Sequence, residues 1–221
     1  MLFDFETLDP KDAYKLVVST VVPRPIAWVV SRDEGGLVNA APYSFFNAFS
    51  DNPVVVGFGC GPRPEGALKD TAANIRANGE FVVNLVPFDH VQGMNVTAVE
   101  FAPEVDEIAE AGLTPVPSAK VGVPRIQESP VALECVTFQL VPAGRHTIVL
   151  GRVVAVHIQD DCVLDSVKCY VDTPRLGLVG RMHGRGWYVR TTDRFEVPRM
   201  TPAEWEARKR GGPAVGAKAA E

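Results

Sequence analysis

The feature that most restricts the fold is a pair of long apolar runs separated by a short turn. Residues 131–141 and 146–158 are the two longest strand candidates, and the segment PAGR joins them. Gly151 interrupts the second run, which predicts a bulge or a close backbone approach there. In the first run we expect Val136, Phe138 and Leu140 to face the core, with more polar surroundings at Glu134, Thr137 and Gln139.

Shorter strand candidates occur along the rest of the chain. Residues 26–31 are rich in β-branched and aromatic side chains, and DEGG supplies a hairpin turn before residues 37–43 return antiparallel. Further strands are predicted at residues 54–60, 81–86 and 187–191.

Helices are predicted only as short segments. One is expected to start at Asp70 or Thr71 as its cap and to end before a left-handed Gly79. Others are expected at residues 89–95 and 104–111, while residues 13–19 suit either a short helix or a lead-in strand. Many strands with turn signals and few, short helices favour a mainly β, antiparallel barrel over an alternating parallel α/β sheet.

The chain is expected to form one sizeable domain. Its 221 residues include 46% hydrophobic residues, and they show neither an internal repeat nor a break in composition. We place this domain at residues 1–200, with an N-terminal arm at residues 2–12 that packs on a neighbour. Residues 201–221 are expected to hold a C-terminal helix, started by the capping-box spacing TPAE, and a disordered tail at residues 211–221.

Charge and residue usage argue against several classes of protein. The formal net charge is -5, so an extended nucleic-acid-binding surface is not expected. The start, MLFDFETLDPKD, lacks the features of a signal peptide, and no apolar run approaches the ~20 residues that span a membrane. The four cysteines and four histidines lack metal-ligand spacing, so we expect free thiols and no metal site. These features predict a soluble cytoplasmic protein.

The stretch from Asn39 to Thr71 carries the strongest functional signal. Its small and aromatic run, APYSFFN, ends in hydroxyl and amide groups suited to a flat heteroaromatic ring. Farther on, Arg63, Gly66 and Lys69 lead into a helix start, where free N–H groups and the helix dipole favour an anion. A ring at one end and a phosphate at the other describe a mononucleotide such as FMN. Solvated surface charge is the alternative for Arg63 and Lys69.

A series of motifs resembles the flavin reductase-like family of FMN-binding split barrels. The motifs are PRPIAWV, NAAPYSFFNA, RPEGALKDT, EFVVNLV, AGLTPVPS, ESPVALEC and LGRVVAVH, and they extend from about Tyr14 to Tyr188. The chain looks most similar to the reductase partners of two-component monooxygenases. The resemblance implies a Greek-key antiparallel split β-barrel with short peripheral helices, and a homodimer that holds FMN near the subunit interface.

The resemblance also implies which residues hold the phosphate and ribityl chain. In related proteins the RPxGxxKDT segment has this role, which transfers it to Arg63, Lys69, Asp70 and Thr71. Asp70 is expected to be a cap or a ribityl hydrogen-bond partner, since its charge would repel the phosphate.

The isoalloxazine ring is expected to lie against the first motif of the stretch. The residues implied by the resemblance, together with the neighbouring tyrosine, are Tyr43, Ser44, Phe45, Phe46 and Asn47. Ordinary core packing is the alternative for the three aromatic side chains. Arg24 is the nearest candidate cation for the N1–C2=O edge of the ring, with a structural salt bridge as its alternative.

His146 is the candidate catalytic residue. It aligns with a Gly-Asp-His motif of related flavin reductases, whose histidine lies near the nicotinamide, but Arg145 stands where those proteins have an acid. A solvent-exposed histidine at a hairpin end is the alternative. Arg181 and His183, in the loop VGRMHGRGWYV, are further candidates for the border of the pocket.

The resemblance implies an NAD(P)H:flavin oxidoreductase. Hydride would pass from NADH or NADPH to FMN, and reduced flavin would go to a monooxygenase component or another acceptor. Two alternatives remain open at this stage. One is an FMN-containing electron carrier or ferric-type reductase fed by a protein partner, and the other is a flavin-binding module without turnover.

Overall fold

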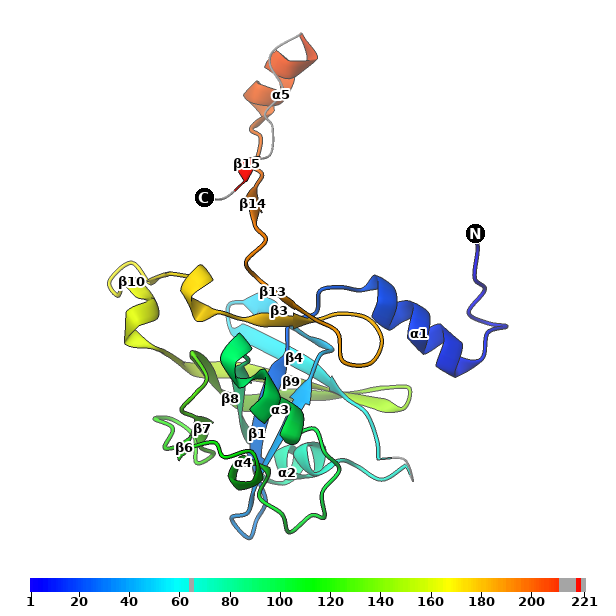
Figure 1. The fold of residues 1–221 in the computed structure, drawn as a ribbon, viewed down its shortest axis with the longest axis vertical. Coiled ribbons are helices and arrows are strands. Elements are labelled where there is room, and N and C mark those ends of the chain that lie inside the picture. The colour runs from blue at the N-terminus through cyan, green and yellow to red at the C-terminus, as the bar shows by residue number, and fades with distance from the viewer. Residues whose placement is uncertain (64–65, 211–217, 220–221) are drawn as a thin grey trace. The chain divides into compact units, whose positions relative to one another are not determined.

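The chain divides into two compact units, Met1–Arg190 and Thr191–Glu221. The computed structural model describes residues 1–63, 66–210 and 218–219 (Figure 1). The first unit contains the main sheet and every residue that was predicted to bind or act on a ligand.

Seven strands of the first unit form one antiparallel sheet in the order β2-β1-β5-β8-β9-β4-β3 (Figure 1). The strands are β1 (Ala27–Arg32), β2 (Val38–Tyr43), β3 (Phe46–Asp51), β4 (Val54–Cys60), β5 (Glu80–Leu85), β8 (Val131–Ala143) and β9 (His146–Ile158). β8 and β9 pair along their length, from Val131 opposite Ile158 to Ala143 opposite His146. The long hairpin predicted from the sequence is therefore confirmed.

The sheet closes on itself at Ser44 and Phe45. These two residues are all that separates β2 from β3, although the two strands lie at opposite edges of the sheet. In a flat sheet, six strand spacings would hold the edges about 29 Å apart, whereas three Cα–Cα steps reach at most about 11 Å. The sheet must therefore curl until its edges approach each other at Ser44 and Phe45. We call this place the seam. The mainly β split barrel is confirmed.

Alternate residues of β1 face two different cores, as the two-residue period of a strand requires. Ala27 and Val29 pack on one face of the sheet in a cluster with Phe58 and Phe81. Trp28 and Val30 belong to a second cluster on the opposite face, which α3 and α4 help to cover. Both faces of β1 are therefore covered by apolar side chains.

Gly151 provides the close approach that was predicted for β9. A Cβ atom at this position would lie 2.3 Å from Cζ of Phe81. The absence of a side chain lets the buried phenyl ring lie directly on the β9 backbone.

The helices of the first unit are short. They are α1 (Pro10–Thr20), α2 (Asp70–Asn78), α3 (Val91–Val96) and α4 (Glu107–Glu110), with 3-10 turns at Phe88–His90, Asp160–Cys162 and Pro174–Leu176. The N-terminal segment left open between helix and strand is helical, and the Asp9 carboxylate caps α1 by accepting from the Lys11 N–H (2.8 Å). α2 packs against β1 and β2, and α4 packs against β2. In the described parts of the chain, no helix has the length and apolar character needed to cross a membrane.

The remaining short strands pair in twos outside the main sheet. β6 (Pro115–Val116) pairs with β7 (Arg125–Ile126), and β10 (Val163–Asp165) pairs with β11 (Tyr170–Val171). β12 (Val179–Arg181) and β13 (Tyr188–Arg190) form a hairpin whose loop carries His183 and Arg185.

One expectation for the first long strand was wrong. Phe138 does not face the core but is 55% exposed, because the β8–β9 register shifts between Thr137 and Gln139 and turns the extra residue outward. Glu134 has polar surroundings, although it is fully buried. Its carboxylate is compensated by the N–H groups of residues 119–121 and by His157.

The second unit contains the predicted C-terminal helix, α5 (Pro202–Lys209). The capping box is confirmed: Thr201 Oγ1 accepts from the Glu204 N–H (3.3 Å), and the Glu204 carboxylate accepts from the Thr201 N–H (2.7 Å). β14 (Phe195–Glu196) pairs with β15 (Lys218–Ala219). Apart from β15, the tail predicted at residues 211–221 lies outside the described residues.

Candidate functional site

Two neighbouring cavities flank the seam. The first, of about 160 Å³, includes Tyr43 and Arg63 in its lining, and we call it the helix-start cavity because α2 begins there. The second, of about 830 Å³, includes Ser44 and Pro62, and we call it the basic cleft. Tyr43 and Ser44 are neighbours in the chain but line different cavities, and the same is true of Pro62 and Arg63. Eight of the eleven predicted site residues line one of the two cavities. Phe45 contacts residues that line the cleft. The other two, Phe46 and Asn47, do not line either cavity.

The N-terminus of α2 is open toward the helix-start cavity. Lys69 is the N-cap residue and its side chain makes no cap hydrogen bond, so the prediction that Asp70 or Thr71 caps the helix was wrong. Both lie inside the first turn, and the Thr71 hydroxyl donates to Asn39 Oδ1 (2.8 Å) rather than to its own helix. With no side chain capping the first turn, the positive end of the helix dipole is available to a ligand. At the other end, Gly79 is the predicted left-handed cap (φ 72°).

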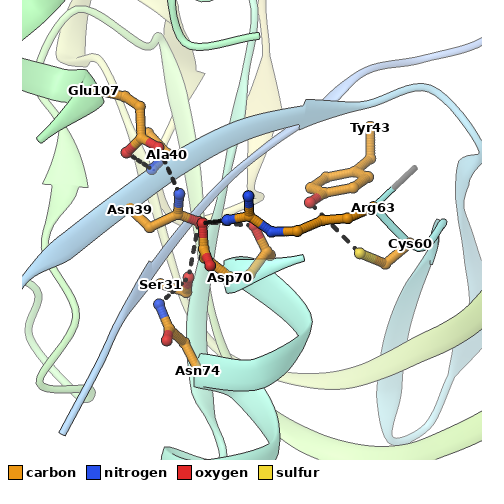
Figure 2. Close-up of polar contacts among 10 residues, drawn as sticks. Ser31, Asn39, Ala40, Tyr43, Cys60, Arg63, Asp70, Asn74 and Glu107 are labelled. Atoms are coloured by element: carbon orange, nitrogen blue, oxygen red, sulfur yellow. Dashed lines mark hydrogen bonds and ion pairs between the residues drawn. The ribbon is translucent and has the colours of Figure 1, made fainter. Parts of the chain in front are cut away.

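A buried hydrogen-bond network fixes the Thr71 hydroxyl from behind. Glu107 on α4 accepts from Asn39 Nδ2 (2.8 Å) and from the Ala40 N–H (3.1 Å), and Asn39 in turn accepts from Thr71 (Figure 2). Glu107 is only 8% exposed. Burial raises the pKa of its carboxyl group, and the hydrogen bonds from Ala40 and Asn39 oppose that shift. β2, α4 and α2 are thus tied together at the wall of the cavity.

Cations and anions both line the helix-start cavity. Arg63 Nη2 lies 2.5 Å from Asp70 Oδ2, and Lys69 is the second cation in the lining (Figure 2). Asp70 therefore orients Arg63 at this cavity. The Tyr43 hydroxyl accepts from Cys60 Sγ (3.5 Å) in the same wall. Burial raises the pKa of Tyr43 well above its ordinary value, which keeps the hydroxyl neutral.

Phe45 is the centre of the aromatic and cationic groups at the basic cleft. Its ring centroid lies 6.3 Å from that of Tyr14 and 6.2 Å from that of His146. The guanidinium carbon of Arg24 lies 5.9 Å from the same centroid. His146 fits here because Gly61 has no side chain: a Cβ atom at Gly61 would lie 3.0 Å from His146 Nε2.

Arg24 is buried and its donors are satisfied by the protein. Its Nη1 donates to the carbonyls of Val18 (2.9 Å) and Val21 (2.6 Å), and its Nη2 donates to the Met182 carbonyl (3.0 Å). Its Nε donates to the Ser44 hydroxyl (3.4 Å). The alternative of a salt bridge is not found among the described residues. Arg24 thus joins the end of α1 and the β12–β13 loop to the seam, and it positions Ser44.

Phe46 and Asn47 line a third cavity, of about 340 Å³. This cavity shares Arg24 and Ser44 with the basic cleft. The predicted ring-binding residues are therefore contiguous in space but divided among adjoining depressions along the seam.

The two candidates in the β12–β13 loop differ in position. Arg181 lines the basic cleft, and it donates to the carbonyls of Gly184 and Trp187. His183 stacks on Trp187 instead, with ring centroids 5.9 Å apart. Within the ranges that the structure describes, no group of three or more His, Cys, Asp or Glu side chains could hold a metal ion. The four cysteines are free thiols.

Sequence reasoning missed Glu107 and the lysines of α1. Glu107 lies 68 positions from its partner Asn39, and a glutamate near a helix start is an ordinary surface pattern. Lys11 was assigned to the N-terminal arm, and Lys15 belongs to a segment whose secondary structure was left open, so nothing placed them at the site. Asn39 was part of the NAAPYSFFNA motif but had no role assigned.

Comparison with known proteins gives a consistent result. Residues 18–172 match the family model of the flavin reductase like domain. An uncharacterized protein of Deinococcus radiodurans is 45% identical over 208 residues, which are 92% of each chain.

Two solved structures are similar along most of the chain. Nitrilotriacetate monooxygenase component B from Bacillus cereus is 31% identical, with a TM-score of 0.84 over 89% of this chain and 98% of that one. The 2-nitrobenzoate 2-nitroreductase NbaA of Pseudomonas fluorescens is 30% identical, with a TM-score of 0.82 over 98% and 100%. With its split barrel, its motifs and a family match over more than half its length, the chain belongs to the flavin reductase like family.

Proposed function

We propose that this protein is an NAD(P)H-dependent flavin reductase that holds FMN across the seam. The phosphate would lie in the helix-start cavity, and the ring would lie at the basic cleft and the cavity beside it. The observation that carries this proposal is that the two cavities are adjacent. Tyr43 and Arg63 line the helix-start cavity, and their chain neighbours Ser44 and Pro62 line the basic cleft. A ligand that fills both must have a flat ring at one end and an anion at the other.

The helix-start cavity fits a phosphate group. Lys69 supplies a positive charge, and the uncapped first turn of α2 supplies N–H groups and the positive end of a dipole. Thr71 is held in place by Asn39 and Glu107, so its hydroxyl needs no reordering when a ligand arrives. Asp70 keeps Arg63 at the cavity by pairing with it.

The seam fits a heteroaromatic ring. Ser44 offers a hydroxyl that Arg24 orients, and Phe45 offers an apolar face bordered by Tyr14 and His146. Bound FMN would supply the redox chemistry, taking a hydride from C4 of NADH or NADPH, which leaves as the oxidised dinucleotide. The chain's part is to orient both rings and to place fixed dipoles near the N1–C2=O edge, where negative charge develops. His146 lines the cleft and is our candidate for orienting the nicotinamide.

We further propose that the protein is a homodimer and that it serves a monooxygenase component. Large apolar side chains are exposed on four strands that are consecutive in the sheet; they are Phe138, Val156, Val54 and Phe49 on β8, β9, β4 and β3. Such a surface suits burial against a second subunit. The likeness to nitrilotriacetate monooxygenase component B supports delivery of reduced flavin to an oxygenase.

One purification tests the proposal. The visible spectrum of the purified protein, before and after adding FMN, shows whether flavin binds, and light scattering gives the mass of the flavin-bound form. Oxidation of NADH and NADPH at 340 nm is then followed with and without added FMN. We expect flavin binding, a dimer mass and flavin-dependent oxidation of at least one dinucleotide. Bound FMN that is reduced only by a protein partner, or never, would contradict the reductase assignment.

A further inference from the structure

We infer that the basic cleft recognises a phosphate on the adenosine ribose of the reductant, so that NADPH rather than NADH is the electron donor. This inference rests on the proposed function and specifies the substrate of the same site. The evidence for it is the distribution of charge around the cleft, the availability of particular cations and the size of the cleft.

The cleft gathers cations in a chain that is acidic as a whole. The net charge of the protein is -5, yet the cleft is lined by six cations: Lys11, Lys15, Arg24, Arg145, Arg181 and Arg185. These come from α1, from the segment before β1, from the β8–β9 turn and from the β12–β13 hairpin. Among the described residues, no carboxylate lines the cleft. A cavity with charges of one sign concentrates ligands of the opposite sign.

Three of these cations are free to meet a ligand. Lys11, Arg145 and Arg185 are exposed, and within the described parts of the chain their side chains have no hydrogen-bonding or ionic partner. The other three are engaged, because Lys15 pairs with Asp12 while Arg24 and Arg181 donate to backbone carbonyls. Solvated arginines are common on protein surfaces, but here the unpaired cations converge on one cavity.

The backbone holds Arg185 at the cleft. It lies between Gly184 (φ 58°) and Gly186 (φ 81°), whose left-handed conformations fold the β12–β13 loop back. Arg181 fixes that fold by donating to the carbonyls of two loop residues, Gly184 and Trp187. Residues of this loop and of α1 line the same cleft.

The size and charge of the cleft match a large, highly anionic ligand. Its volume of about 830 Å³ exceeds the needs of the flavin and nicotinamide rings and leaves room for the adenosine end of the reductant. NADH carries only the pyrophosphate charges, whereas NADPH adds a phosphate group at the adenosine end. Guanidinium groups bind phosphate through paired, charge-assisted hydrogen bonds, but they gain much less from the neutral hydroxyl of NADH.

Binding of nucleotide fragments tests the inference without turnover. The FMN-loaded protein is titrated calorimetrically with adenosine 2′,5′-bisphosphate, ADP and 5′-AMP. We expect the 2′,5′-bisphosphate to bind about tenfold more tightly than ADP, since several charged contacts are specific to the 2′ position. ADP is the control, because it also has two phosphate groups but carries both of them at the 5′ position. Equal binding of the two would mean that the cleft reads total charge alone, which would overturn the assignment.

Kinetics with charge-matched variants complete the test. In the parent protein we expect kcat/KM for NADPH to exceed that for NADH by about tenfold, and Arg145→Gln or Arg185→Gln to reduce that ratio about two- to fivefold each. Arg76→Gln is the control, because Arg76 is exposed on α2 and does not line the cleft. It should leave the ratio unchanged. Retained FMN in each variant shows that it has folded.

The outcomes separate this inference from the proposed function. If the bound flavin is reduced equally well by both dinucleotides, or if the control lowers the ratio as much as the cleft variants, the inference fails while the reductase assignment stands. If neither dinucleotide reduces the flavin, the reductase assignment itself fails, and the inference fails with it.

Discussion

The helix-start cavity and the basic cleft lie side by side, yet they are built in opposite ways. In the cavity, Thr71 is 1% exposed and is held by Asn39 and Glu107 through hydrogen bonds that exist without a ligand. In the cleft, Arg145 and Arg185 are exposed side chains without partners among the described residues. One wall is fixed by hydrogen bonds within the protein, whereas the cations of the other wall have no such bonds.

The difference suggests two kinds of occupant. A fixed, buried wall has little side-chain entropy to lose on binding, which favours tight and lasting attachment of one ligand. Exposed cations lose rotamer freedom with each binding event and are screened by salt, which favours a ligand that arrives, reacts and leaves. The cavity therefore suits a retained cofactor, and the cleft suits an exchanging reductant.

The largest effect is expected from removing the buried carboxylate of the cavity. Glu107→Ala leaves Asn39 Nδ2 and the Ala40 N–H without their acceptor in a buried site. We expect the free energy of unfolding in urea to fall by about 2–4 kcal/mol, because each unsatisfied buried donor costs roughly 1–3 kcal/mol. Arg185→Ala in the cleft is the matched control and should change stability by no more than about 0.5 kcal/mol. Similar losses in both variants would remove the structural contrast between the two regions.

The next largest effect concerns the phosphate. Lys69→Ala should weaken FMN binding by about tenfold or more, because a charge-assisted hydrogen bond contributes roughly 1.5–3 kcal/mol. Riboflavin lacks the phosphate, so its affinity should stay nearly constant. Arg145→Ala removes a cation from the cleft instead and should barely affect FMN. Fluorescence titrations with both flavins measure this, and equal losses for FMN and riboflavin would move Lys69 out of the phosphate site.

A smaller effect is expected at His146, which belongs to the cleft. His146→Ala should raise KM for the dinucleotide or lower kcat several-fold, while FMN affinity and Tm stay close to those of the parent protein. The reason is that His146 borders the cleft beside Phe45. His183→Ala is the control, since His183 stacks on Trp187 and does not line the cleft. Unchanged kinetics in the His146 variant would place the β8–β9 turn outside the active site.

The smallest effect is a pH dependence of stability with a defined sign. Burial raises the pKa of Glu107, so the folded state holds its proton more tightly than the unfolded state does. The ordinary pKa of a glutamate is 4.5. The contribution of Glu107 to stability should therefore fall as the pH rises from 4.5 through the raised pKa, and it should be constant at higher pH. Glu107→Gln should remove this slope, which urea midpoints over a pH series measure.

Glu134 provides the opposite sign in the same experiment. Burial raises its pKa, but hydrogen bonds from the Ala119 N–H and His157 outweigh that and the net shift is downward. Its contribution is present above its ordinary pKa of 4.5 and is lost as pH falls through the lowered value. If Glu107→Gln and Glu134→Gln changed the pH profile in the same direction, the assignment of a raised pKa to Glu107 would be wrong.

Features of the chain that depend on near neighbours could be read from the sequence. The β8–β9 hairpin, the left-handed cap at Gly79 and the Thr201–Glu204 capping box all follow from turn chemistry and periodicity within a few residues. The errors arose where distant partners intervened. The Thr71 hydroxyl bonds to Asn39 instead of capping its own helix, and Phe138 is turned outward by the register of β8 against β9.

By itself, the sequence determined the antiparallel strands, the family and the candidate residues that meet at the seam, because motifs and local propensity are properties of short segments. Only the tertiary structure decided how those residues divide between two cavities. That division depends on closure of the sheet at Ser44 and Phe45, and on contacts such as Asn39 with Glu107, 68 positions apart. The gathering of cations from four segments at one cleft likewise exists only after closure, because periodicity within a segment carries no information about which distant segment will lie beside it.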